Sequence, residues 1–220
     1  MKLRYLRVLL PATLLVLVFS VSGWAATVYN QPTDFNGAFS SQNDTVSFGL
    51  FAQSFDNFTL GSSTGLTQVD WVGSYFNPST QGPITQWTLQ IYSDNGGQPG
   101  TLLYQNQVAG TGNETFLQID NVGDPTYSYS MNINFNAAAG TEYWLSVYPD
   151  LAFPPQWGWE TATGGDGASW QCFQGSCGPL SNDLAFSLSG GTTSTPEPGT
   201  LVMLGSGILG LAGTIRRKLF

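Results

Sequence analysis

Histidine is absent from this sequence, and lysine and arginine are missing from all but its two ends. The six basic residues are Lys2, Arg4, Arg7, Arg216, Arg217 and Lys218. Residues 26–195 therefore hold thirteen Asp and Glu residues and no basic side chain, and the whole 220-residue chain has a formal net charge of -8. Any counter-charge for this stretch has to come from solvent or from a partner.

These absences argue against several classes of function. Phosphate contacts depend on Lys and Arg, so we expect no nucleic-acid partner. Without His, neither a Ser-His-Asp nor a Cys-His site can be assembled. Because repulsion among unscreened acids destabilises a compact state, we expect dissolved cations, divalent ones included, to balance the carboxylates. No cofactor is expected, although a structural calcium ion is left open.

The first 25 residues are typical of a secretory signal peptide. A basic start precedes an apolar run at residues 8–21, and Gly23, Trp24 and Ala25 suit cleavage after Ala25. This predicts a signal helix and, as partners, the Sec machinery and signal peptidase. The alternative is an uncleaved N-terminal anchor.

The last 31 residues are predicted to be a polar linker at 190–195 followed by a membrane segment at 196–220. The apolar run at 200–215 is rich in glycine and ends at Arg216, Arg217 and Lys218. Sixteen residues reach about 24 Å as a helix, the short limit for crossing a bilayer, so we predict a transmembrane helix at about 199–215. The basic stop should stay cytoplasmic, which places the rest of the chain outside.

Pro196, Glu197 and Pro198, followed by this apolar stretch and basic cluster, resemble the PEP-CTERM sorting signal. The resemblance covers about residues 195–220. It implies export in a Gram-negative bacterium that makes exopolysaccharide, with an exosortase as the processing partner. The protein is then held transiently in the inner membrane with its domain in the periplasm, before it reaches the cell surface or the medium. An ordinary C-terminal anchor with a chance Pro-Glu-Pro is the alternative.

Cys172 and Cys177 are the only cysteines. Export to an oxidising compartment favours a disulfide between them. The chain-entropy estimate for so short a loop is about 2 kcal/mol, so we interpret the bond as a local staple on a loop.

Residues 26–189 have the pattern of a single all-β domain. Apolar and polar residues alternate, and turn residues recur throughout, without sustained helical periodicity. We predict roughly ten strands in a two-sheet antiparallel sandwich, of jelly-roll type. The predicted strands lie at 54–60, 66–76, 86–92, 101–109, 115–120, 127–135, 142–148, 156–161 and 183–188.

The domain also resembles a module that recurs in exported proteins with this tail. The matching segments are Phe-Asp-Asn-Phe-Thr-Leu at 55–60, Ile-Tyr-Ser-Asp-Asn-Gly-Gly-Gln-Pro-Gly at 91–100, Tyr-Trp-Leu-Ser-Val at 143–147 and Asp-Leu-Ala-Phe at 183–186. The resemblance implies a β-sandwich and carries no active site.

Three kinds of candidate site remain, each with a structural alternative. Trp157 and Trp159 lie two apart on one strand face and could stack on sugar rings, or else pack in the core. Asp94 and Asp166 could offer oxygens to Ca²⁺, or else serve as turn residues. A carboxylate pair could hydrolyse a glycosidic bond, but none of the domain's glutamates sits in a catalytic motif.

We therefore expect a non-enzymatic, exosortase-sorted surface or matrix protein associated with exopolysaccharide or biofilm. The alternatives are a carbohydrate-binding module that uses Trp157 and Trp159, and a carboxylate-pair glycosidase.

Overall fold

The computed structural model describes residues 26–192, and within this range the chain forms fifteen β-strands. The strands are β1 (Ala26–Gln31), β2 (Thr33–Ser40), β3 (Gln42–Asp44), β4 (Gly49–Thr59), β5 (Thr64–Phe76), β6 (Gln86–Asp94), β7 (Pro99–Ala109), β8 (Thr115–Ile119), β9 (Pro125–Ala137), β10 (Glu142–Asp150), β11 (Gln156–Ala162), β12 (Ser169–Phe173), β13 (Ser176–Leu180), β14 (Asp183–Leu184) and β15 (Phe186–Thr192). Eight of the nine predicted strands are each present as one strand, and the ninth, at 183–188, is divided between β14 and β15.

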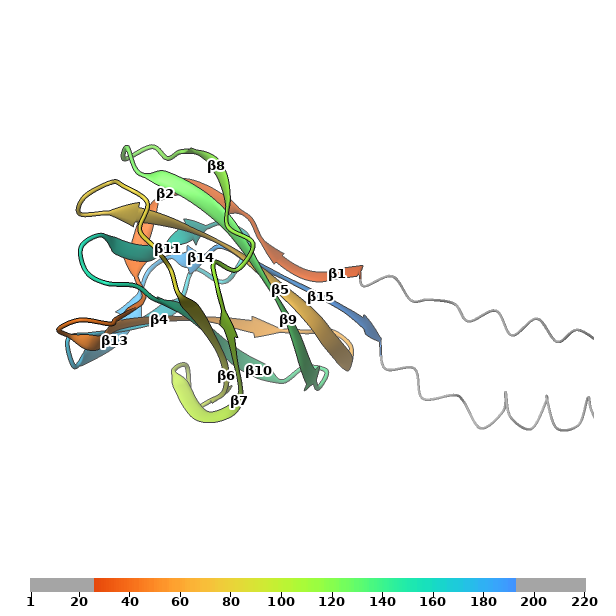
Figure 1. The fold of residues 1–220 in the computed structure, drawn as a ribbon. Helices are drawn as coiled ribbons and strands as arrows, with labels where there is room; N and C mark the ends of the chain where they lie inside the picture. Colours follow the sequence, from red (N-terminus) through yellow and green to blue (C-terminus); the bar gives the residue numbers. More distant parts are fainter. Residues whose placement is uncertain (1–25, 193–220) are drawn as a thin grey trace, which may run out of the picture.

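The strands form two facing sheets, which confirms the predicted sandwich (Figure 1). One sheet has eight strands in the order β1-β15-β5-β11-β14, with β2 beside β11, and with β9 and then β8 beyond β5. The other has seven strands in the order β13-β12-β4-β3-β10-β6-β7. The neighbours pair antiparallel, apart from one parallel bridge between β3 and β10.

Aromatic rings fill the space between the sheets. The ring centroid of Trp87 lies 4.8 Å from Trp71, 4.7 Å from Tyr129 and 4.9 Å from Trp157. All four side chains are buried. Since no basic residue occurs here, this aromatic packing and the backbone ladders stand in place of ion pairs.

The start and end of the described segment lie side by side. Ala26 of β1 pairs with Gly190 of β15, and Figure 1 shows both ends leaving the same end of the sandwich. The turn between β3 and β4 and the β12–β13 hairpin lie at the opposite end (Figure 1). We call that opposite end the distal end.

The domain ends later than predicted. β15 continues to Thr192, so residues 190–192 belong to the sheet and not to the proposed linker at 190–195. Gly190 pairs with Leu66, and a Cβ at position 190 would lie 2.4 Å from the carbonyl oxygen of Gly65. The glycine that suggests a spacer is therefore required for close contact between strands.

The described residues include no helix that is long and apolar enough to cross a membrane. The signal helix predicted at 1–25 and the transmembrane helix predicted at about 199–215 lie outside residues 26–192, as does the remainder of the linker.

Candidate functional site

Trp157 and Trp159 do not form a sugar-binding platform. Both are fully buried on β11. The Trp157 indole nitrogen donates to the Tyr129 hydroxyl at 3.2 Å, and that of Trp159 donates to the carbonyl of Ala185 at 2.8 Å. Both rings do share one face, as predicted, but that face is turned into the core.

Asp94 and Asp166 serve as turn residues. Asp94 accepts from the Trp144 indole at 2.9 Å and from the backbone N–H groups of Gly96 and Gly97. The Trp144 hydrogen bond is the main cause that lowers the pKa of Asp94. Asp166 accepts from the N–H of Ala168 at 3.0 Å. Within residues 26–192, no three or more Asp, Glu or Cys side chains are grouped to hold a metal ion.

Two of the domain's three glutamates, Glu114 and Glu142, accept hydrogen bonds from neighbouring side chains. Glu114 accepts hydrogen bonds from the hydroxyls of Tyr75 and Tyr129 at 2.6 and 2.8 Å. Glu142 accepts from the Asn57 amide at 3.1 Å. Neither of these two glutamates lines any of the five hollows described for residues 26–192, and Asp70 and Asp124, in separate hollows, are the only acids that do.

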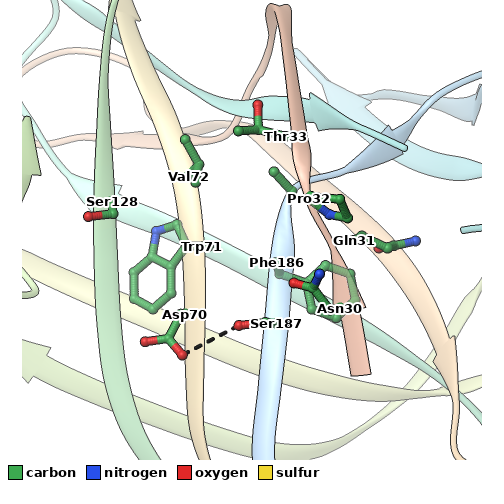
Figure 2. Close-up of a pocket in the computed structure, with 11 residues that line it drawn as sticks. Asn30, Gln31, Pro32, Thr33, Asp70, Trp71, Val72, Ser128, Phe186 and Ser187 are labelled. Carbon is green, nitrogen blue, oxygen red and sulfur yellow. Dashed lines mark hydrogen bonds between the residues drawn. The ribbon is translucent and has the colours of Figure 1, made fainter. Parts of the chain in front are cut away.

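One of these hollows lies where β1, β5 and β15 meet, and Figure 2 shows its lining. The hydroxyl of Ser187 donates to the Asp70 carboxylate at 3.5 Å across it. Asp70 is the only acid that lines it, so this hollow holds no carboxylate pair.

Four phenylalanines gather at the distal end, and we call this group the phenylalanine tip. Its members are Phe48, Phe51, Phe153 and Phe173. The centroid of Phe51 lies 6.3 Å from Phe48, 6.2 Å from Phe153 and 6.0 Å from Phe173. Phe48 is 63% exposed and Phe173 37% exposed. Large exposed apolar groups clustered in this way mark contact surfaces more often than single exposed residues do.

Asp44 organises the phenylalanine tip. Its side chain is buried and accepts from the backbone N–H groups of Val46, Ser47 and Phe48 at 3.1, 2.8 and 2.8 Å. It also accepts from the N–H of Phe153 at 3.0 Å, which ties the loop before β11 to the turn between β3 and β4. Burial acts to raise the pKa of Asp44, but these four donors outweigh it and lower the pKa to about 2.

The rings surround a hollow of about 200 Å³ that is otherwise lined by amides. The amide residues are Asn77, Gln156 and Gln174. Asn and Gln both donate and accept hydrogen bonds, and no lining residue is charged. The hollow thus combines flat apolar surfaces with neutral polar groups, a combination suited to neutral polyhydroxyl compounds.

The predicted disulfide is present, and it holds part of the phenylalanine tip. Cys172 and Cys177 are bonded across β12 and β13, with their Cα atoms 4.0 Å apart. They staple a regular hairpin and not a loop, because Phe173 also pairs with Ser176. The bond therefore fixes the hairpin end that carries Phe173.

Sequence reasoning missed the phenylalanine tip because its members come from three separate segments. Phe48 lies in the turn before β4 and Phe51 near the start of β4, whereas Phe153 lies in the loop before β11 and Phe173 at the end of β12. No short-range pattern joins them.

The comparisons with known proteins concern the C-terminal tail. Residues 194–218 match the PEP-CTERM protein-sorting motif, which confirms the resemblance found at Pro196, Glu197 and Pro198. No curated protein matches the chain significantly. Residues 26–192 thus form an all-β domain that precedes an exosortase sorting motif, and the match supports an exported protein sorted through the membrane.

Proposed function

We propose that this chain is a non-enzymatic surface or matrix protein that an exosortase processes and that associates with exopolysaccharide. The observation that carries the proposal is the sorting motif at residues 194–218. The fold supports it, because the described segment leaves its sandwich beside Ala26, at the end that faces the tail. The distal end is then presented away from the membrane.

The sorting step is tested with Glu197→Ala in the full chain, expressed in an exosortase-containing host. We expect the variant to accumulate in the inner membrane with its tail intact, while Thr193→Ala, just before the matched residues 194–218, is processed normally. Cell fractionation shows where each variant accumulates, and the intact mass of the protein shows whether its tail is still attached. Normal processing of Glu197→Ala would contradict the sorting assignment.

Sugar recognition at the phenylalanine tip is a second candidate function. Phenyl rings pack against the apolar faces of pyranose rings, and amides bond to sugar hydroxyls. The absence of basic residues in 26–195 favours a neutral polysaccharide over an acidic one. This candidate differs from the tryptophan platform in its residues and in its place in the fold.

The test uses Phe48→Ala in the full chain, because Phe48 is mostly exposed and its loss should leave the fold intact. We expect binding to the host's own exopolysaccharide to weaken about fivefold, since an aromatic contact contributes about 1 kcal/mol. Phe116→Ala, which removes a 54% exposed ring from β8, is the control. Equal binding by both variants would remove the tip from this role, and hydrolysis of the polysaccharide would contradict a non-enzymatic protein.

A further inference from the structure

A second group of polar side chains lies buried in the eight-stranded sheet, away from the phenylalanine tip. Glu160 on β11 is fully buried, and neither of its carboxylate oxygens has a hydrogen-bond partner. Its strand neighbour Trp159 points into the core, and since side chains alternate along a strand, Glu160 points the other way. The domain therefore buries a carboxylate on the outer side of this sheet with nothing to balance it.

Two further side chains converge on Glu160. Ser74 of β5 pairs with Gly158, two residues before Glu160, so it lies on the same face of the sheet. Ser74 is fully buried, and its hydroxyl has no partner. Asp120 follows β8 and uses one oxygen to accept from the N–H groups of the 122–124 turn, while its other oxygen is buried and unpaired.

The strand pairing brings the two side chains to the same region of the sheet. Thr126 of β9 pairs with Ser74 of β5 on one side and with Gln118 of β8, two residues before Asp120, on the other. Consistent with this placement, burial raises the pKa of Glu160 to about 8, the Ser74 hydroxyl opposes this shift, and Asp120 adds to it. The turn that carries Asp120 is in turn tied to β2, because the N–H of Asn121 donates to the carbonyl of Phe35 at 2.8 Å and the Asn121 amide donates to Asn36 at 2.8 Å. This turn therefore lies against β2, the strand in which Ala38 pairs with Glu160.

Four buried oxygens on three residues thus lie near one another, and the only donors among them are the Ser74 hydroxyl and a proton that Glu160 can hold. Buried polar atoms are nearly always paired, and an unpaired buried carboxylate is costly. No basic side chain exists between residues 26 and 195 to supply a positive charge. Either a proton on Glu160 or a cation from solvent therefore has to balance the two carboxylates.

We propose that this group binds one calcium ion, with Glu160, Asp120 and Ser74 as ligands. Calcium takes only oxygen ligands, tolerates irregular geometry and is balanced in charge by two carboxylates. Because only two ligands are acidic, we expect the affinity of an extracellular module, with a Kd of about 10⁻⁴–10⁻³ M. The ion would join β11, β5 and the β8–β9 turn, three segments of the eight-stranded sheet.

Binding of the ion is measured first, on the full chain in detergent micelles. Terbium, a luminescent substitute for calcium, should be excited through Trp157 and Trp159 on the same strand, and calcium should displace it. Calcium at 5 mM, about five or more times the expected Kd, should also raise the thermal midpoint relative to a chelator. Absence of both effects in the wild type would overturn the proposal and leave a proton shared between Glu160 and Asp120.

Variants then locate the ion. Glu160→Gln should weaken terbium and calcium binding at least tenfold and abolish the calcium-dependent rise in thermal midpoint. Glu142→Gln, the same chemical change in the other sheet, should match the wild type. If Glu160→Gln does not fold, Ser74→Ala retains both carboxylates and should weaken binding severalfold. Calcium binding that is unchanged in the Glu160 variant, or in Ser74→Ala where that variant replaces it, places the ion elsewhere and overturns the assignment.

Discussion

Asp44→Asn tests whether a single carboxylate holds the phenylalanine tip together. The carboxylate has two oxygens for its four N–H donors, whereas an amide has only one, so at least two donors lose their partner. A buried N–H left unpaired costs about 1–3 kcal/mol, and the tip is near solvent, so we expect a loss of about 2 kcal/mol at pH 7. Asp166→Asn, in an exposed turn, should change stability by less than about 0.5 kcal/mol.

The same carboxylate makes this difference depend on pH. Its folded pKa of about 2 lies below the ordinary value of 3.8, so its contribution is present above pH 3.8 and is lost as the pH falls through 2. The difference between wild type and Asp44→Asn should therefore shrink by about 1–2 kcal/mol between pH 5 and pH 2. Urea unfolding of the full chain, followed by tryptophan fluorescence, measures it. A difference that stays constant with pH, or that matches Asp166→Asn, would refute this role for Asp44.

Two further predictions concern the core. Gly73→Ala should lower stability by about 1–3 kcal/mol, because its Cβ would lie 2.0 Å from the Trp157 ring, whereas Gly178→Ala, which meets nothing within 4 Å, should be nearly neutral in thermal denaturation. Burial raises the pKa of Asp56 well above its ordinary value, with Asp183 adding to the shift, so wild-type stability should fall as the pH rises from 4 to 8. Asp56→Asn should show a smaller decline, because the raised pKa of Glu160 contributes the rest, and it should be the more stable protein at pH 8 in urea titrations. A decline as steep in Asp56→Asn as in the wild type would contradict this role for Asp56.

Strand positions follow closely from the sequence, because alternation is a local signal. The predicted strand at 86–92 is β6, and the stretch at 142–148 is β10. The strands at the N-terminus were missed because β2 is irregular. Phe35 and Gly37 both have positive φ, which breaks the two-residue period that the prediction depends on.

The candidate sites were harder to predict, because alternation does not reveal which face of a sheet is covered. Every residue of β11 is buried, so Trp157 lies in the core while Glu160 on the other face is buried as well. Two tryptophans spaced two residues apart give the same sequence pattern whether their rings are buried in the core or exposed as a platform. The phenylalanine tip and the Glu160 group are both assembled from segments far apart in the chain, which only the fold brings together.

The position of β15 has a mechanical consequence. A pull between the distal end and the tail would run along β15, which pairs with β5 from Phe186 to Thr192 on one side and with β1 on the other. Hydrogen bonds loaded lengthwise in this way share the force and break together, whereas bonds at the end of a peeled strand break one at a time. The sandwich is therefore arranged to resist tension applied at its C-terminal strand without unravelling from that strand.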